Sequence, residues 1–593
     1  MASSDDDEDL KLALALSMQH SPANTSTNKT VVDLTSDDEG EDSDKELKQA
    51  IALSLQEATQ PMTGAAPATT DQQLSSVDTT SLAELTAQNV LTSALPSKST
   101  PFVMDRKAME AERLQRLAER KRKRTASPDR PQKQTLKATE SVIAGRSTSS
   151  PSQPDSVLQF PDGTIKRTYA AGYPRTDDIT IDEVLQAPTV RIAVISSFQW
   201  DAEWMSRKLS HLKVKQHWVM NVRDAETQAR YRRDLAASGT PNLRMHFPPM
   251  NPAVGIAHSK YMLLVGEQKM RVVVSTANME PVYWGEMVNN WQPGVLENTV
   301  FLIDLPRRPD GAVGSVEDLP PFGQELVHFL EAQQLDPLII KGVLKFDFSR
   351  TAHLAFVHSI GVPSDTASHP TGLPSLAKAI QTLSLSQPAH IQLDYATSSL
   401  GALSPTFLQR IHSAARGVPF TPQTPTAPTP HAPRNLRIHY PTAATIAAST
   451  GGPRCAGVVS LRKAHYASPS FPAACLRDHV STRRGIISHN KLLFARGRRE
   501  DGQPFAWVYV GSANASEAAW GAQKVLKNGQ LGKLAVRNWE CGVVMAVPGG
   551  RLAGLGEGEG EAPPMSVFEG TVEVPFRCPG EKYEGRMPWV QDS

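Results

Sequence analysis

The sequence contains few cysteines, and they are not arranged as metal ligands or disulfide partners usually are. Four occur in 593 residues, at Cys455, Cys475, Cys541 and Cys578, and no two of them form a CxxC pair. A zinc knuckle or a thioredoxin-like motif requires such pairs, and small secreted domains carry many more cysteines for their length. The sequence therefore predicts neither a zinc-binding module nor a disulfide-stapled scaffold.

The sequence also lacks long apolar runs and an excess of charge of either sign. No stretch of about 18 consecutive apolar residues occurs, and the acidic start, MASSDDDEDL, does not resemble a signal peptide. Lys and Arg number 62 against 61 Asp and Glu. This balance excludes a uniformly basic protein, whereas it leaves room for a local basic groove. We expect a soluble intracellular protein without a membrane partner.

The first 150 residues are almost without aromatic side chains, Phe102 being the exception. They are instead rich in Ser, Thr, Asp, Gln and Pro. Such a segment buries too little apolar surface to offset the entropy that is lost on ordering. We therefore expect residues 1–150 to form a disordered regulatory tail with short helical islands, and order to begin near Ser156.

From Ser156 onward, short apolar runs alternate with amphipathic stretches, as in α/β folds whose mixed sheets are flanked by helices. In the first half (156–345), strands are expected at 191–197, 243–247, 258–265, 270–275 and 299–304, and helices at 201–209 and 325–333. In the second half (346–593), strands are expected at 353–359, 436–440, 486–494, 506–510 and 540–547. The Pro/Thr tract 418–434 is expected to be a surface loop or insertion. The run 353–359 resembles 191–197, which favours an internal duplication.

A short motif that occurs once in each half supports this duplication. His258-Ser259-Lys260 is followed by an apolar run, a turn and a second apolar run that leads to Asn278, and His489-Asn490-Lys491 is followed in the same way by Asn514. About two His-x-Lys/Arg matches are expected by chance in a chain of this composition, so a single copy would carry no weight. Two copies with the same flanking strands and the same Ala-Asn loop indicate a functional site.

The residue types of the motif suit a phosphate ester. Residues i and i+2 of a strand face the same side, so each His and Lys should share one face. One imidazole can attack phosphorus while the other protonates the leaving oxygen, and the ammonium and amide groups can hold the phosphoryl oxygens. The acidic clusters of a two-metal nuclease are missing around these histidines. We therefore expect neither a metal nor another cofactor.

The paired His-x-Lys…Asn units resemble those of the phospholipase D superfamily. The Asp that usually follows each Lys there is missing, and in this respect the chain is similar to the tyrosyl-DNA phosphodiesterase family. The segments that carry this resemblance are Ser197–Met205 (SFQWDAEWM), His258–Leu264 (HSKYMLL), Gly511–Gly521 (GSANASEAAWG), Arg537–Met545 (RNWECGVVM) and the C-terminal VPFRCPG…PWV. The resemblance covers about residues 156–593. It implies two similar halves with the active site between them.

The resemblance also implies roles for individual residues. His258 matches the family nucleophile and His489 the general acid/base, while the phosphate ligands match Lys260, Lys491, Asn278 and Asn514. Glu540 matches a glutamate that orients one catalytic histidine. An ordinary carboxylate at a strand edge is the alternative, and the strand position favours the orienting role. Asn289 stands where the family often has a Gln, eleven residues after the first Asn. Ser398 and Ser399 loosely match a serine-rich clamp for DNA phosphates, and a helix cap or turn is at least as good an interpretation.

Two acidic segments of the tail, at 5–20 and 42–58, share the pattern acidic run, Leu-x-x-Ala-x-x-x-Ser. The patterned residues are Leu10, Ala13 and Ser17, and Leu47, Ala50 and Ser54. On a helix these offsets lie on one face, where the Leu supplies an apolar anchor and the small Ala allows a partner to approach closely. Both segments resemble ubiquitin-interacting motifs. Acidic amphipathic helices without a specific partner are the alternative.

Two further tail segments resemble short recognition signals. Residues 31–39 (VVDLTSDDE) resemble a SUMO-interacting motif, which would add a strand to the edge of a sheet, and a chance match is an equally good interpretation. The cluster at 120–124 consists of five successive basic residues, Arg120–Arg124. Such a cluster predicts nuclear localisation or contact with nucleic acid.

The residues and the resemblance together predict a nuclear DNA-repair phosphodiesterase that needs no metal. Its expected substrates are the 3′-phosphotyrosyl DNA adducts of stalled topoisomerase I and other 3′-blocking lesions, hydrolysed through a covalent phosphohistidine. We expect a monomer that binds DNA and, through its tail, ubiquitin. The alternatives are a lipid-cleaving phospholipase D, and a ubiquitin-binding adaptor on an inactive phosphodiesterase fold.

Overall fold

The computed structural model describes residues 158–591 apart from short gaps. The gaps are 288–293, 363–367, 387, 389, 421–430, 432, 527–530 and 556–561. The predicted tail with its ubiquitin- and SUMO-interacting motifs and its basic cluster lies outside the described residues, as does most of the Pro/Thr tract 418–434. Of the two compact units into which the chain divides, Met1–Pro101 and Phe102–Ser593, the second contains every described residue.

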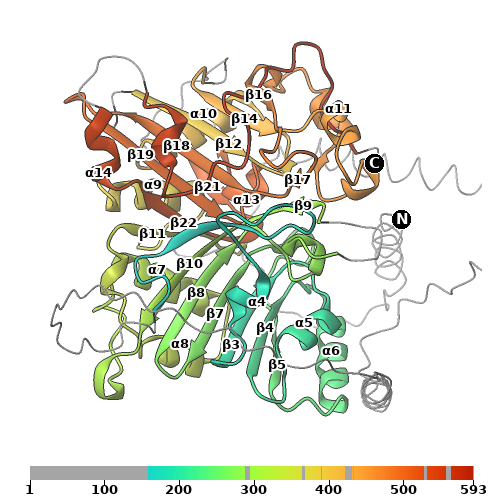
Figure 1. Ribbon diagram of the computed structural model, residues 1–593, viewed down its shortest axis with the longest axis vertical. Coiled ribbons are helices and arrows are strands. Elements are labelled where there is room, and N and C mark those ends of the chain that lie inside the picture. The colour runs from blue at the N-terminus through green and yellow to red at the C-terminus, as the bar shows by residue number, and fades with distance from the viewer. Residues whose placement is uncertain are drawn as a thin grey trace, which may run out of the picture. The chain divides into compact units, whose positions relative to one another are not determined.

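The first half forms one eight-stranded mixed sheet, drawn in teal to green in Figure 1. In the order in which they lie side by side, the strands are β2 (Asp178–Ile179), β1 (Thr164–Thr168), β10 (Thr299–Pro306), β8 (Lys269–Ser275), β7 (Tyr261–Gly266), β3 (Val190–Ser197), β4 (Lys215–Met220) and β5 (Leu243–His246). β3, β4 and β5 are parallel, whereas β3, β7, β8, β10 and β1 alternate in direction. β3 reads VRIAVISS because both of its faces are covered, which favours a continuous apolar run.

The second half repeats this arrangement in yellow to red. Its strands, side by side, are β11 (Leu354–Ser359), β22 (Asn538–Ala546), β19 (Pro504–Gly511), β18 (Leu492–Arg498), β12 (His390–Ala396), β14 (Leu436–Tyr440) and β16 (Leu476–Asp478). Across the first sheet the strands follow the order β1-β10-β8-β7-β3-β4-β5, and across the second sheet they follow the order just given. When the strands of each half are numbered by their place in the sequence, the two orders are the same, and neighbouring strands also run in the same relative directions. The structure therefore confirms the duplication that the repeated motif predicts.

One detail of the predicted duplication is wrong. The run 191–197 forms β3, whose counterpart in sheet order is β12, whereas the run 353–359 forms β11, the counterpart of β1. Both runs are buried apolar strands. Their compositions are therefore alike although they occupy different places in the two sheets.

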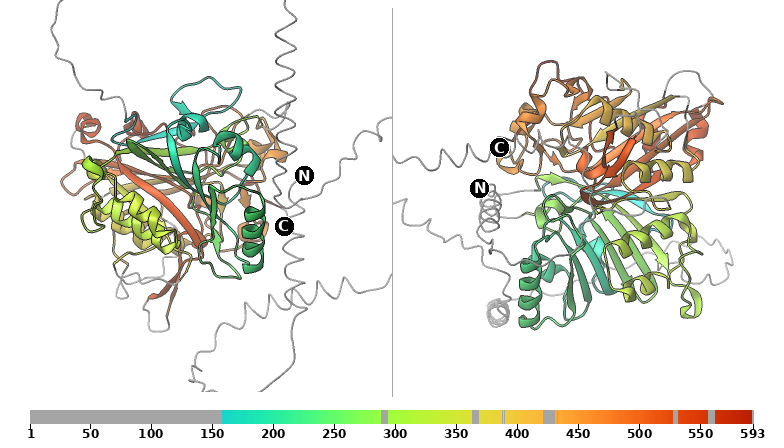
Figure 2. Two further views of the ribbon diagram at one scale, coloured as in Figure 1. Left: turned by 90° about the horizontal axis from the view of Figure 1, so that it is seen from below. Right: turned by 180° about the vertical axis from the view of Figure 1, so that it is seen from behind.

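Helices cover both faces of the sheets, as the two further views in Figure 2 show. They are α4 (Ile181–Leu185), α5 (Ala202–Lys208), α6 (Ala225–Ala237), α7 (Pro321–Ala332), α8 (Pro337–Val343), α9 (Leu373–Thr382), α10 (Pro405–Ala415), α11 (Ala443–Ala447), α12 (Lys463–Tyr466), α13 (Glu517–Trp520) and α14 (Gly549–Leu552). α5 begins where the sequence predicts, because the Asp201 carboxylate accepts a hydrogen bond from the Trp204 amide (2.8 Å). Within the described part of the chain, no helix is long and apolar enough to cross a membrane.

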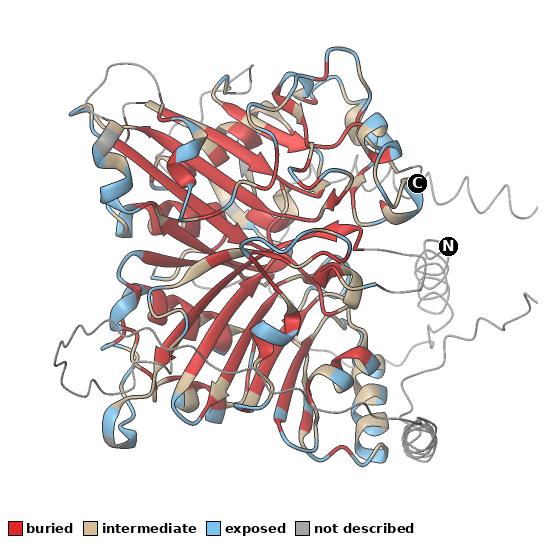
Figure 3. Ribbon diagram, viewed as in Figure 1, coloured by how far each residue is buried: buried red, intermediate tan, exposed pale blue. Residues whose placement is uncertain are grey.

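The two halves share their hydrophobic core. Phe322 of α7 lies between Phe301 of β10 and Phe356 of β11, with ring centroids 6.5 and 5.9 Å away. Among the described residues, each of the two apolar clusters contains residues from both sheets. Figure 3 shows the buried strands as a continuous red layer in each half. Because neither half has a core of its own, groups carried by different halves are held in a fixed relation to each other.

Candidate active site at the junction of the two halves

Two-residue strands carry each His-x-Lys motif across to the other half. β6 (Ile256–Ala257) pairs with the start of β22, and β17 (Ile487–Ser488) pairs with β9 (Leu296–Glu297), which directly precedes β10. In Figure 1, β22, β9 and β17 lie where the two halves meet. The strands expected at 258–265 and 486–494 are therefore interrupted at the motif, because the chain passes there from one sheet to the other.

Main-chain hydrogen bonds fix both histidines at this crossing. The His258 N–H donates to the carbonyl of Trp539 (3.0 Å), and the His489 N–H donates to the carbonyl of Glu297 (2.8 Å). His258 is thus anchored to β22 of the second half, and His489 is anchored to β9, the short strand that directly precedes β10 of the first half. The structure thus brings the two predicted catalytic histidines into one site, each through a main-chain hydrogen bond to the other half.

Both motif lysines are fully buried beside their histidines. Lys260 Nζ donates to the His258 carbonyl (2.8 Å), while Lys491 Nζ donates to the carbonyl and to Nε2 of His489 (2.6 and 2.9 Å). Burial lowers the pKa of Lys260 to about 8. Burial and the charge of Lys260 lower the pKa of Lys491 well below its ordinary value. The two ammonium groups therefore act on each other in a water-poor site, where a bound anion would favour their charged forms.

A carboxylate from the other half orients His258. The Glu540 side chain accepts from His258 Nδ1 at 2.9 and 3.1 Å, and also from Ser512 Oγ (2.5 Å) and Asn538 Nδ2 (2.9 Å). Burial raises the pKa of Glu540, but His258, Lys260 and Ser512 outweigh it, so this pKa is lowered overall. An ionised Glu540 fixes the proton of His258 on Nδ1 and leaves a lone pair on Nε2.

An amide oxygen takes the corresponding place at His489. Asn298 Oδ1 accepts from His489 Nδ1 (2.9 Å) and from Thr276 Oγ1 (2.8 Å), and the ring of Tyr283 packs edge-on against the imidazole at 4.8 Å. Burial and the charge of Lys491 lower the pKa of His489 well below its ordinary value. Because a neutral amide stabilises an imidazolium less than a carboxylate does, His489 gives up its proton more easily than His258 would.

Asn298 is the site residue that sequence reasoning misses. The predicted residue, Asn289, lies outside the described residues, in a segment that separates Asn278 from β9. The structure places Asn298 against His489, while the role predicted for Asn289 stays a prediction. Asn298 can be recognised by its position relative to the main-chain contact of its histidine. It directly follows Glu297, whose carbonyl accepts from His489, just as Glu540 directly follows Trp539, whose carbonyl accepts from His258.

The two motif asparagines lie in the same site with different partners. Asn514 Oδ1 accepts from Thr397 Oγ1 (3.0 Å), Ser398 Oγ (3.3 Å) and the Ser399 N–H (3.2 Å). The predicted serine pair therefore contacts Asn514, the asparagine of the second motif. Asn278, which is buried, contacts Gln199 through its amide (2.8 Å).

Other features of the described residues lie apart from this cluster. One group of metal-type side chains converges, namely Asp394, His439 and Cys578. Asp394 there accepts from Arg437 and Arg496, whose positive charges oppose a cation. None of the predicted site residues belongs to this group.

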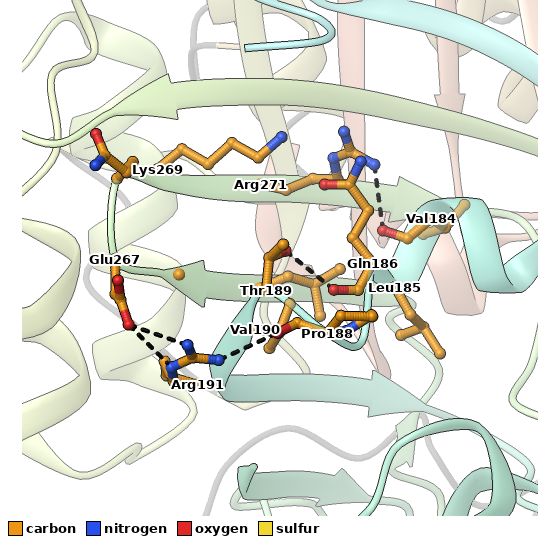
Figure 4. A pocket seen from close by; sticks show the side chains of 13 residues that line it. Val184, Leu185, Gln186, Pro188, Thr189, Val190, Arg191, Glu267, Lys269 and Arg271 are labelled. Atoms are coloured by element: carbon orange, nitrogen blue, oxygen red, sulfur yellow. Dashed lines mark hydrogen bonds and ion pairs between the residues drawn. The ribbon is translucent and has the colours of Figure 1, made fainter. Parts of the chain in front are cut away.

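A pocket at the far end of β7 is also separate from the histidines. It is lined by residues 184–191 together with the β7–β8 turn, and Figure 4 shows Arg191 reaching Glu267 across it. β7 begins next to Lys260 and ends at Gly266. The pocket therefore lies about 20 Å from the motif, given the rise of a strand.

Comparisons with known proteins agree with this geometry. The model of a family described as tyrosyl-DNA phosphodiesterase matches residues 164–584, and a ubiquitin interaction motif matches residues 5–19 and 44–58. The tyrosyl-DNA phosphodiesterase 1 of Arabidopsis thaliana is 25% identical over 380 residues, which are 62% of this chain and 59% of that protein. The matched part of the chain thus spans less than two thirds of this curated relative.

Solved structures support the fold. A mutant of the yeast tyrosyl-DNA phosphodiesterase is similar with a TM-score of 0.52 and 18% identity, over 73% of this chain and 99% of that chain. A second crystal structure of the yeast protein has a TM-score of 0.50 and 18% identity, over 72% and 100% of the two chains. Both confirm the predicted α/β fold.

Proposed function

Because the chain belongs to the tyrosyl-DNA phosphodiesterase family, we propose that it hydrolyses 3′-phosphotyrosyl bonds in DNA, such as those left by stalled topoisomerase I, and other 3′-blocking adducts. One observation carries the proposal. Two histidines, one from each half, have their Nδ1 atoms fixed by Glu540 and Asn298, which leaves Nε2 of each ring as the atom that acts on a phosphate. Nε2 of His489 contacts Lys491 Nζ, a group that a bound phosphate would draw toward its own oxygens. The buried lysines beside them supply the matching positive charge.

In the proposed first step, His258 attacks phosphorus. Its Nε2 lone pair forms the N–P bond, and the bond from phosphorus to the tyrosyl oxygen breaks. The imidazole becomes positively charged, and the Glu540 carboxylate at 2.9 Å stabilises that charge. His489, protonated when the anionic substrate offsets the lysine charges, donates its Nε2 proton to the leaving phenolate oxygen.

In the proposed second step, water releases the DNA. His489 is now neutral and its Nε2 takes a proton from the water that attacks phosphorus. The N–P bond breaks and its electron pair returns to His258 Nε2. The products are DNA with a 3′-phosphate and an enzyme whose His489 is again protonated, ready for the next substrate.

The lysines and asparagines are proposed to hold the phosphoryl oxygens through both steps. Lys260 and Lys491 flank the histidines from either half, and preorganised donors of this kind stabilise charge that shifts between oxygens. Ser398 and Ser399, which contact Asn514, are proposed to bind the next DNA phosphate. The protein is proposed to act as a monomer.

The tail is proposed to bring this activity to damaged DNA. The matched ubiquitin interaction motifs support binding to ubiquitin. The segment 31–39 is proposed to bind SUMO, and the basic cluster 120–124 to direct the protein to the nucleus. These proposals rest on sequence alone.

The test of the proposed function is cleavage of a 3′-phosphotyrosyl oligonucleotide with and without a chelator. We expect tyrosine and a 3′-phosphate oligonucleotide as products, with an unchanged rate in excess chelator, because the site supplies its own positive charges. A phospholipid substrate serves as the control for lipid cleavage. Loss of activity in chelator with rescue by magnesium would contradict the metal-free chemistry, and cleavage of neither substrate would contradict the enzyme.

The rate should fall in alkaline solution because Lys260 must be charged to attract the phosphodiester. Its pKa is lowered to about 8, so the charge is present below that pH and is lost as the pH rises through it. We expect kcat/KM to fall above pH 8 while kcat persists to higher pH, since bound phosphate raises the pKa of the lysine. Profiles of both constants between about pH 6 and 10 check this, and a kcat/KM that stays level to pH 10 would contradict it.

Ubiquitin binding should depend on the small alanines of the two tail motifs. Replacing Ala13 and Ala50 with Trp is expected to weaken binding to ubiquitin chains at least about tenfold, because a large side chain blocks close approach. Titration calorimetry with the full-length chain measures this. Cleavage of a short oligonucleotide by the same variant should remain normal, and unchanged ubiquitin binding would leave the segments as plain acidic helices.

A further inference from the structure

The amide of Asn514 has one possible orientation. Its Oδ1 accepts from three donors, the hydroxyls of Thr397 and Ser398 and the N–H of Ser399, at 3.0 to 3.3 Å. The two hydroxyls can donate or accept, whereas the Ser399 N–H can only donate, so it must face Oδ1 and not Nδ2. The Nδ2 group of Asn514 is therefore directed away from them, as a donor for a phosphoryl oxygen.

Asn278 occupies the corresponding place in the first half but has no such donors in the orientation described. Its Nδ2 faces Gln199 Oε1 at 2.8 Å, and its Oδ1 is buried without a hydrogen-bond partner. Buried polar atoms are almost always paired, so an unpaired one calls for a ligand or a different orientation. A phosphoryl oxygen is itself an acceptor and cannot pair with this Oδ1.

Turning two amides resolves the conflict without moving any heavy atom outside them, and requires that the Tyr283 hydroxyl hydrogen rotate away from Gln199. The oxygen and nitrogen of an amide have nearly the same size and shape. With both side chains turned, Gln199 Nε2 donates to Asn278 Oδ1 across the same 2.8 Å contact and to Tyr283 Oη across the 2.5 Å contact. The tyrosine hydroxyl accepts as readily as it donates. Asn278 Nδ2 then occupies the unpaired position.

We propose that Gln199 is a positioning residue that sets the orientation of the Asn278 amide, so that Nδ2 donates to the phosphoryl group. This inference rests on the proposed function. Gln199 follows β3 and residues 397–399 follow β12, and these strands are counterparts in the two sheets. The two halves thus reach the same orientation of their asparagines with different donors.

The main chain holds Gln199 in place for this role. Its carbonyl accepts from Ser197 Oγ (2.6 Å) and from the N–H of Met279 (3.1 Å), the residue after Asn278. The glutamine and the asparagine therefore keep a constant separation. A substitution in the Gln199 side chain changes what faces Asn278 without releasing the backbone.

Two substitutions of similar size separate orientation from packing. Gln199→Glu presents only acceptors, so it draws Asn278 Nδ2 away from the substrate. Gln199→Met presents neither a donor nor an acceptor and leaves the Asn278 amide free to turn. On a 3′-phosphotyrosyl oligonucleotide we expect kcat about threefold to tenfold lower for Gln199→Met and about a hundredfold lower for Gln199→Glu, with smaller changes in KM. An unchanged kcat for Gln199→Met, or a Gln199→Met enzyme no faster than Gln199→Glu, would overturn the proposal.

A double-mutant cycle excludes simple repulsion between a new carboxylate and the phosphate. If Gln199→Glu acts through Asn278, its deficit relative to Gln199→Met should vanish when Asn278 is replaced by Ala. If the deficit persists there, charge repulsion is the cause and the proposal fails. The wild-type chain in the same assay distinguishes failure of the proposed function from failure of the Gln199 proposal. An inactive wild-type chain would overturn the proposed function, whereas an active one leaves the variants to test the role of Gln199.

Discussion

Replacing His258 with Ala is expected to lower the rate of 3′-phosphotyrosyl cleavage at least about a thousandfold and to leave no covalent protein–DNA species. His258 is the histidine whose Nδ1 faces a carboxylate, which stabilises the cationic phosphohistidine. Without its Nε2 no N–P bond can form. Denaturing gels of quenched reactions should therefore show neither product nor a shifted protein band.

His489→Asn is expected to fail in a different way. A phenol has a pKa of about 10, so phenolate can leave slowly without an acid. Water is a poor nucleophile and depends on the base in the second step, which should slow turnover by about a hundredfold or more. The covalent species should therefore accumulate. A shifted band with the His258 variant but not with the His489 variant would reverse the two roles.

Glu540→Gln is expected to slow formation of the covalent species by about ten- to a hundredfold, because the charged acceptor for His258 is lost. Ser512, Asn538 and His258 all donate to this carboxylate, so an amide leaves one of these donors facing an NH2 group. Rapid-quench measurement of the first turnover separates this step from hydrolysis of the adduct.

A matched substitution controls for the loss of one carboxylate. Glu267 is exposed and pairs with Arg191 at the opposite end of β7. Glu267→Gln should leave both steps at the wild-type rate. Equal first-step rates for Glu540→Gln and the wild-type chain would show that the carboxylate does not support the nucleophile.

The sequence sufficed for those site residues whose spacing is local. Each His and Lys lie two residues apart, and each Asn ends the hairpin that follows, so one motif placed them without a structure. Glu540 could be found through the family resemblance, and the structure places it against His258. Ser398 and Ser399 were a loose match and lie beside Asn514.

Contacts between segments far apart in the sequence could not be derived in this way. Asn298 reaches His489 from 191 residues away, a contact that no local spacing encodes. Gln199 meets Asn278 because β3 and β8 end at the same edge of one sheet. The interruption of the predicted strands at His258 and His489 likewise depends on pairing with the other half, which local hydrophobic pattern does not encode.

The covalent intermediate provides the most direct test of the central claim. Full-length His489→Asn protein is incubated with a 3′-phosphotyrosyl oligonucleotide, quenched under alkaline denaturing conditions and digested, and the nucleotide-bearing peptide is sequenced by mass spectrometry. The account predicts a phosphoryl linkage to Nε2 of His258, with the wild-type chain showing the same linkage only transiently. A nucleotide attached to any other residue, or release of tyrosine without any attached nucleotide, would contradict it.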